Sequence, residues 1–261
     1  MQGWWGRVGL AVILMLLLGR PGSTRPAGAS GVAGVAGVAG SVAAWGWNVA
    51  GQVGDGTTTD RPVATAVPGL AGITRLAAGV HHSLALAGDG TVWAWGANFY
   101  GQLGDGTTMT TGCGCNPTLV HLATPTGIVA VATGGQHSLA LARDGTIWAW
   151  GSNAFGEIGN GTVRGLTTCG CVPTPVHLAT PTGIVAIAAE YGAHSVALAG
   201  DGTVWVWGVN PNGEIGDGTT TTTGCQCNAT PVHLTAPTGV VAVAAGSNHT
   251  GLAPVFRTGQ R

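Results

Sequence analysis

One phrase of fifteen residues recurs along this chain at a spacing of about 55 residues. It reads HSLALAGDGTVWAWG at 82–96, HSLALARDGTIWAWG at 137–151 and HSVALAGDGTVWVWG at 194–208. A chain that repeats itself at such a period is an array of one small supersecondary unit. The repeat therefore constrains the fold more strongly than any single residue does.

Each unit contains the signals of about four short strands. Apolar residues alternate in the opening segment 127–142, where Val129 and Val131 share one face, as they do in a half-buried strand. An Asp-Gly pair follows, which is the strongest short-range signal for a β-hairpin. The return strand carries two Trp two positions apart, so both rings lie on one side of the sheet. A second tight turn, GQLGDGT at 101–107, and a strand such as PTPVHL at 173–178 complete the unit.

This pattern predicts an all-β chain, a β-propeller of about four blades built from units of about 55 residues. A solenoid is the alternative. The segment 41–48 holds only the Trp half of a unit, and the segment 239–253 holds only the His half. We expect the strands of 240–253 to pair with 41–48, because this would close a ring and remove two exposed edges. A truncated array would leave those edges open.

The first forty residues differ from the repeats. Arg7 precedes an apolar run at 8–18, and small residues at 27–30 offer a cleavage site, so we interpret 1–29 as an export signal. A membrane anchor is the alternative. Residues 30–40 form a Gly/Ala/Val linker or a frayed outer strand, 41–253 form the propeller, and 254–261 form a C-terminal tail. We therefore expect a secreted protein, extracellular or at the cell surface, with no membrane span after cleavage.

The charge of the chain argues against a nucleic-acid partner. Charged residues make up 7% of the sequence, and every basic residue apart from His is Arg. Cleavage would remove Arg7, Arg20 and Arg25, leaving six Arg against ten acidic residues and a net charge of −4. A nucleic-acid surface needs a basic stripe, and a surface with so few charges steers charged partners weakly.

The His-Ser strand, DGTVWAWG and the following GQLGDGT resemble the repeat of the regulator-of-chromosome-condensation family over residues 41–253. The resemblance implies propeller blades of about 50–60 residues, and the family usually closes more blades than the four predicted here. It has a founding member that exchanges guanine nucleotides and docks on nucleosomes, which conflicts with export and with an acidic chain. Secreted bacterial members, one of them an inhibitor of β-lactamase, imply a rigid scaffold that offers its loops to a protein partner.

Six cysteines form three Cys-x-Cys pairs, each between the second tight turn and the last strand of a unit. They are Cys113 with Cys115, Cys169 with Cys171, and Cys225 with Cys227. An exported chain favours disulfides, either within each pair or between neighbouring blades. Zinc or copper bound by paired thiolates and free thiols are the alternatives.

Histidine and tryptophan recur at fixed positions. The repeated histidines are His82, His137, His194 and His249. We expect each to bond the backbone of its own blade; the alternative is four imidazoles that line a central channel and hold a metal. The repeated Trp are expected to pack between blades. Trp47 breaks that pattern, so we expect it to be exposed.

No motif for catalysis is present. Asp lies in Gly turns, where it bonds its own backbone, and Glu157 and Glu214 replace Gln52 and Gln102 at one position that we interpret as tolerant. We find neither a phosphate-binding loop with Lys nor a metalloprotease motif. The sequence therefore predicts no enzymatic activity, no metal site and no cofactor.

The repeats of this chain vary at two positions after a shared Asn. Loops on a rigid scaffold are where recognition usually resides. Phe99, Tyr100 and Phe155 occupy these positions, and with Trp47 they are the candidate partner-binding residues. We predict a binding module for a protein or a surface polymer. The alternatives are a structural segment of a larger propeller array and a glycan-binding or glycan-active protein.

Overall fold

The computed structural model describes residues 42–109, 112–163, 170–189, 191–221 and 224–254. These residues form strands, turns and loops, without a helix among them. The predicted export signal at 1–29 and linker at 30–40 lie outside the described residues, as does the tail beyond residue 254. The all-β prediction is confirmed.

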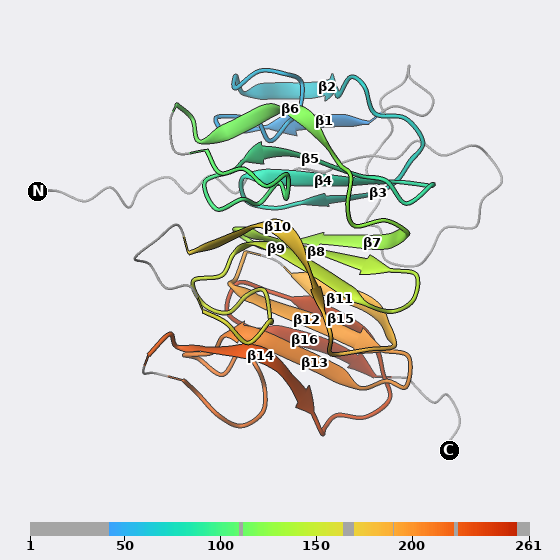
Figure 1. Ribbon diagram of the computed structural model, residues 1–261, viewed down its shortest axis with the longest axis vertical. Helices are drawn as coiled ribbons and strands as arrows, with labels where there is room; N and C mark the ends of the chain where they lie inside the picture. The colour runs from blue at the N-terminus through green and yellow to red at the C-terminus, as the bar shows by residue number, and fades with distance from the viewer. Residues whose placement is uncertain (1–41, 110–111, 164–169, 190, 222–223, 255–261) are drawn as a thin grey trace, which may run out of the picture.

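The strands form three four-stranded antiparallel sheets, which we call blades, and two two-stranded sheets, which we call half-blades (Figure 1). The first half-blade pairs β1 (Ala43–Gly46) with β2 (Arg61–Ala66). The first blade contains β3 (Ile73–Ala78), β4 (His82–Ala87), β5 (Val92–Ala97) and β6 (Cys115–Leu122). The second blade contains β7 (Ile128–Thr133), β8 (His137–Ala142), β9 (Ile147–Ser152) and β10 (Cys171–Leu178). The third blade contains β11 (Ile184–Ala189), β12 (His194–Ala199), β13 (Val204–Val209) and β14 (Cys227–Leu234). The last half-blade pairs β15 (Val240–Ala245) with β16 (Thr250–Pro254).

Each blade is a meander in which strands that follow one another in the chain are also neighbours in the sheet. The predicted Asp-Gly turns connect the second and third strands. In the first blade, the N–H of Gly90 donates to the carbonyl of Ala87 at 3.0 Å, and Gly90 has a φ of +90°. Glycine adopts this left-handed conformation without steric cost, which explains why the turn repeats without change.

The core lies between successive sheets, in four apolar clusters that correspond to four junctions. Every residue of the second strands β4, β8 and β12 is buried. The first strands β3, β7, β11 and β15 lie next to one another in that order, so the sheets stack face to face along an arc (Figure 1). Burial of each large apolar side chain stabilises the stack by about 1.5–3 kcal/mol.

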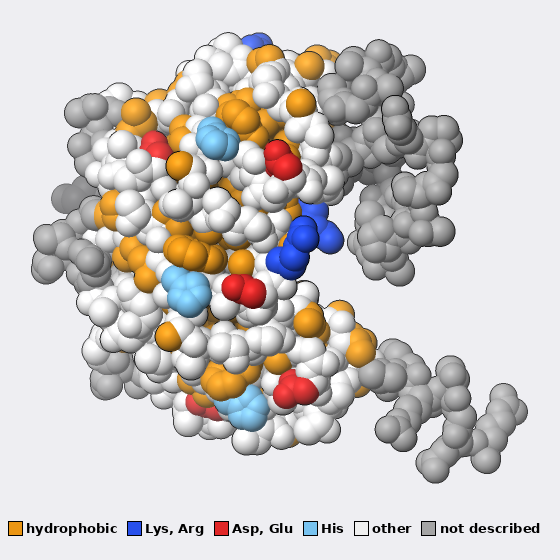
Figure 2. All heavy atoms as spheres, turned by 45° about the vertical axis from the view of Figure 1, so that its right-hand side comes forward, with side chains coloured by type: hydrophobic (Ala, Val, Ile, Leu, Met, Phe, Trp, Pro, Cys, Tyr) orange, Lys and Arg blue, Asp and Glu red, His pale blue; other side chains and the backbone are white. Residues whose placement is uncertain are grey.

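The arc is open in the space-filling view (Figure 2). The predicted pairing of 41–48 with 240–253 is not among the strand pairs of the described residues, in which β1 pairs with β2 and β16 pairs with β15. The first half-blade packs on the first blade and the last half-blade packs on the third blade. Among the described residues, the second edges of β1 and β16 thus have no partner strand.

Candidate functional site

The loops divide between two ends of the molecule. The loops after β1, β5, β9 and β13, and the short connections between the first and second strands, leave one end, which we call the loop end. The Asp-Gly turns leave the opposite end, which we call the turn end. Variable residues therefore gather at the loop end, and the repeated turns gather at the turn end.

A buried asparagine organises each long loop. In the first blade, the Oδ1 atom of Asn98 accepts the N–H of Leu103 at 3.1 Å, and the Nδ2 group donates to the carbonyl of Thr107 at 3.2 Å. Asn98 has no exposed surface. The equivalent residues are Asn48, Asn153 and Asn210, and each Oδ1 atom likewise accepts the N–H of the residue five positions later. The shared Asn thus fixes the frame in which two neighbouring positions vary.

The position shared by Gln52, Gln102, Glu157 and Glu214 is buried. A side-chain oxygen of Gln102 accepts the N–H of Tyr100 at 2.8 Å, and one of Glu157 accepts the N–H of Phe155 at 2.8 Å. Gln and Glu are interchangeable here because both place an acceptor oxygen at the same distance along the side chain. The position therefore tolerates this exchange, but its burial and its role in holding the loop are visible only once the loop closes on itself.

The same residues hold the next blade through their backbone. The carbonyl of Gln102 accepts the indole N–H of Trp150 at 2.8 Å and the hydroxyl of Ser138 at 2.9 Å. The Nε2 atom of His82 lies 2.9 Å from the oxygen of Ser138. Equivalent bonds join Gln52 to Trp95 and Ser83, and Glu157 to Trp207 and Ser195. The packing role predicted for these Trp is confirmed, because all three have no exposed surface.

Three of the four repeated histidines, His82, His137 and His194, bond a hydroxyl of the next sheet, which corrects our expectation of a bond within their own blade. Because Ser138 gives its single hydroxyl hydrogen to Gln102, the imidazole of His82 must donate from Nε2. Burial, together with a smaller effect of the nearby His81, lowers the pKa of His82 to about 3. Burial likewise lowers the pKa of His137 to about 3. Both imidazoles are therefore neutral under ordinary conditions and act as structural hydrogen-bond donors.

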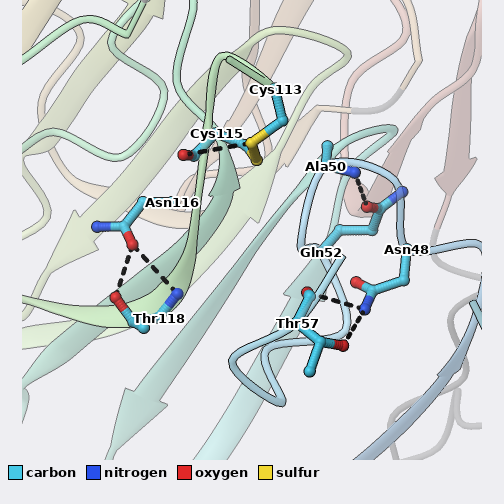
Figure 3. Close-up of a disulfide and its surroundings, with 8 residues drawn as sticks. All are labelled: Asn48, Ala50, Gln52, Thr57, Cys113, Cys115, Asn116 and Thr118. Carbon is cyan, nitrogen blue, oxygen red and sulfur yellow. Dashed lines mark hydrogen bonds between the residues drawn. A yellow bond between two sulfur atoms is a disulfide. The ribbon is translucent and has the colours of Figure 1, made fainter. Parts of the chain in front are cut away.

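Two of the predicted cysteine pairs are disulfides within the pair: Cys113 with Cys115, and Cys225 with Cys227. In the third pair, Cys169 lies outside the described residues. The sulfur of Cys113 also lies 3.6 Å from the carbonyl of Cys115, and Cys115 packs against Ala50 in the loop of the first half-blade (Figure 3). The disulfide therefore braces a blade where the preceding loop meets it.

A hollow of about 170 Å³ opens at the loop end between all three blades. Its lining includes His81 from the first blade, Gln136 and Phe155 from the second, and Tyr191 from the third. Tyr191 is 59% exposed. Glu157 also contributes, but its carboxylate is engaged by Ser152 and Phe155, and burial raises its pKa. The accessible part of this hollow is thus aromatic and polar, with little charge.

The structure separates the four predicted loop residues into two groups. Phe155 lines the hollow. Trp47 is 41% exposed and borders the hollow through His81, since the ring centroids of Trp47 and His81 lie 5.2 Å apart. Phe99 is 44% exposed, but its ring covers Gly114 in the disulfide segment. Tyr100 is half-buried beside Phe99. All four lie at the loop end, and only the first group surrounds the hollow.

Sequence reasoning missed His81 and Tyr191. His81 lies between the first and second strands of its blade, at a position where the other units carry different residues. Its side chain is half-buried against Trp47. Tyr191 occupies the equivalent connection of the third blade. A signal was present, since both stand in the connection between the first and second strands, where the units of this chain differ from one another.

The described residues contain no cluster of three or more His, Cys, Asp or Glu that could hold a metal ion. In the same part of the chain, no helix has the length and apolar character needed to cross a membrane. The Asp residues of the Asp-Gly turns bond their own turns, as Asp89 does by accepting the N–H of Thr91 at 2.9 Å.

Known proteins resemble this chain in both sequence and fold. Human E3 ubiquitin-protein ligase HERC2 is 33% identical over 108 residues, which are 41% of this chain and 2% of HERC2. The ultraviolet-B receptor UVR8 of Arabidopsis thaliana is 29% identical over 214 residues, which are 80% of this chain and 46% of UVR8. The structure of Prp20p from Saccharomyces cerevisiae has a TM-score of 0.68 at 24% identity and covers 83% of this chain and 52% of Prp20p. Yeast Prp20 bound to Kap60 has a TM-score of 0.68 at 26% identity and covers 82% of this chain and 50% of that one.

The chain thus spans about half the length of these solved structures and of UVR8, and far less of HERC2. A sequence model described as the regulator of chromosome condensation (RCC1) repeat matches residues 39–86, 89–141, 144–198 and 201–253. A second model with the same description matches 73–102, 128–157 and 184–214. Each of the four matched repeats covers the last two strands of one sheet and the first two strands of the next. Since together they cover most of the chain, it belongs to the regulator of chromosome condensation (RCC1) repeat family.

Proposed function

We propose that this chain is a secreted, non-catalytic binding module that takes a protein partner at its loop end. The observation that carries the proposal is the hollow bordered by Trp47, His81, Phe155 and Tyr191. Aromatic side chains are enriched at the centres of protein interfaces, because they bury a large area at a small entropic cost. The rigid frame of buried Asn residues holds these side chains in place before a partner arrives.

A protein partner fits the chemistry of this surface better than a nucleic acid or a charged polymer. The surface offers aromatic rings and amides with few charges, so recognition would depend on shape and apolar contact. The similar yeast protein Prp20 binds Gsp1p and histones, and it has also been solved bound to Kap60. These complexes support a protein as the class of partner for an RCC1-type scaffold.

An extracellular or cell-surface location is part of the proposal. The two disulfides are of the kind that persists in an oxidising compartment, and the residues 1–29 have the pattern of an export signal. The absence of catalysis is also part of it, because the carboxylates nearest the hollow and the turns are already engaged by the protein itself.

The test is capture of partners from a culture medium and a cell-surface fraction with three forms of the chain as bait. The first is unchanged, the second carries Trp47→Ala, Phe155→Ala and Tyr191→Ala, and the third carries Val185→Ala as a matched control. Val185 is an apolar residue that is 60% exposed away from the loop end. We expect a protein that the first and third baits recover equally and the second loses at least tenfold.

A fourth bait with Phe99→Ala and Tyr100→Ala locates the surface more finely. Retained capture by this bait assigns the partner to the hollow, and lost capture extends the surface over the disulfide segment. Equal recovery by all four baits would show that the loop end is not the binding surface. Recovery of a polysaccharide in place of a protein would favour the glycan-binding alternative.

A further inference from the structure

The junctions between sheets share one set of contacts, and the two ends of the arc each hold half of a set. In the interior junctions, a loop carbonyl accepts a Trp indole, and the loop Gly two residues later lies against that ring. A Cβ atom on Gly104 would lie 2.7 Å from Nε1 of Trp150. The matching glycines are Gly54, against Trp95, and Gly159, against Trp207. This close approach leaves room only for glycine.

The loop of the third blade has no indole to cover among the described residues. The carbonyl of Glu214 accepts the hydroxyl of Thr250 at 2.8 Å, as the interior carbonyls accept Ser. However, the nearest atom to a Cβ on Gly216 is a methyl of Leu234 at 3.8 Å. Gly213 likewise meets nothing closer than 3.9 Å, whereas Gly101 lies against Pro173 of the following blade. This loop is shaped for a Trp strand that the last half-blade lacks.

The missing strand has its counterpart at the other end of the chain. Trp45 in β1 occupies the repeat position of Trp95, Trp150 and Trp207, but it is only half-buried where they have no exposed surface. Pro62 in β2 matches Pro117 and Pro173 in the sheet register. The first half-blade therefore supplies the indole and the proline that the loop of the third blade is shaped to cover.

The free strand edges match as well. By analogy with β4 and β5, where Leu84 opposes Ala94, β16 would pair with β1 so that Gly251 opposes Ala44. Residues of β16 are exposed or half-buried, whereas those of β12 are all buried. Neither β1 nor β16 carries a charged side chain, although edge strands are commonly protected by charge.

We propose that a second copy of this chain closes both open ends. The β16 edge of each copy pairs with β1 of the other, and the loop of each third blade covers Trp45 of its partner. Two identical junctions result, as twofold symmetry requires. Two copies are favoured over closure within one chain, because the described strands form an open arc (Figure 2) and match about half of Prp20 at a TM-score of 0.68.

The test uses single cysteine variants of the purified chain, Ala44→Cys and Gly251→Cys, mixed and oxidised. Pairing between copies predicts a disulfide-linked dimer when the two variants are mixed, and a dimer mass in sedimentation that Leu252→Asp converts to a monomer. Trp45→Ala should raise the dissociation constant about 30-fold, as expected for a central buried aromatic. Val185→Cys mixed with Ala44→Cys is the control and should not cross-link.

Closure within one chain gives a different result. The double variant, Ala44→Cys with Gly251→Cys, would then form a cross-link inside a monomer, while the mixed single variants would stay unlinked. That outcome overturns the proposal. A chain that remains monomeric at all concentrations, with no cross-link in either arrangement, also overturns it.

Discussion

The junction between the first and second blades and the junction between the third blade and the last half-blade are built from the same repeat. In both, a buried loop carbonyl accepts a hydroxyl from the next sheet, Ser138 in one and Thr250 in the other. Only the first also holds an indole, that of Trp150. The comparison teaches that the shared carbonyl–hydroxyl bond sets how one sheet lies on the next. The Trp of the following sheet contributes much of the apolar surface that is buried at the junction.

The largest effect is expected from truncating that indole. Trp150→Ala should lower the free energy of unfolding by about 3–5 kcal/mol, the usual cost of removing a fully buried aromatic ring. Trp45→Ala should cost about 1 kcal/mol in the dilute chain, because its ring is already half-exposed. Urea unfolding at low protein concentration measures both. Equal losses would show that the two junctions do not differ as described.

The hydroxyl that both junctions share gives a smaller effect. Ser138→Ala leaves the buried Nε2–H of His82 without an acceptor, which should cost about 1–3 kcal/mol. Thr250→Ala should cost less, since that side chain is half-buried and water can replace its hydroxyl. The same unfolding measurement compares them, with Thr91→Ala at the exposed turn end as the control. A greater loss from Thr250→Ala would contradict the comparison.

The buried histidines predict how the interior junctions respond to acid. The pKa of His137 is depressed to about 3 in the folded chain, whereas the unfolded chain takes up the proton near pH 6.5. Its contribution to stability is therefore complete above pH 6.5 and is lost as the pH falls toward 3. The loss is about 1.4 kcal/mol per pH unit for each such histidine.

His137→Gln should reduce that slope by about 1.4 kcal/mol per pH unit between pH 6 and 4.5. Urea unfolding at a series of pH values measures the slope. The exposed Val185 provides the control in the variant Val185→Ala, which removes no titratable group and should leave the slope unchanged. An unchanged slope in His137→Gln would show that this imidazole is not held neutral by burial.

The smallest effect is expected from the disulfides. Replacing Cys113 and Cys115 by Ser opens a ring of three residues, and the loop-entropy relation gives a loss of about 1–2 kcal/mol for so short a loop. Thermal unfolding of this variant, with and without a reductant, measures the loss. The Asp-Gly turn at 88–91 lies at the turn end, opposite the disulfide segments, so proteolysis within 88–91 should not change on reduction. A large loss on reduction would mean that the pairs brace more than their own loops.

Much of the blade could be predicted from sequence, and the junctions could not. The Asp-Gly turns and the alternation in 127–142 are local signals, and they gave the correct strands. A local sequence pattern does not distinguish Trp93 from Trp95, since both lie on the same side of β5. Their burial differs because the loop of the preceding sheet covers Trp95, whereas Trp93 contacts His121, with 5.1 Å between the two ring centroids.

The candidate site shows the same division. Exposure of Trp47 was predicted correctly, because it departs from the repeated frame. Of the three aromatic residues at the variable positions, Phe99 is exposed, whereas Tyr100 and Phe155 are half-buried. The grouping of Phe155 with His81 and Tyr191 could not be predicted, because the three side chains come from connections more than 30 residues apart in sequence and meet only when the blades stack. Contacts between units depend on the angle at which blades stack, which the period of a repeat does not encode.

Amide hydrogen exchange of the dilute, monomeric chain tests the central comparison most directly. Protection reports the free energy of local opening along the chain. We predict equally slow exchange in β4, β8 and β12, whose residues are all buried, and exchange in β16 that is faster by on the order of 100-fold. Exchange in β16 as slow as in β12 would contradict the account, because it would mean that the last junction is as complete as those that hold an indole.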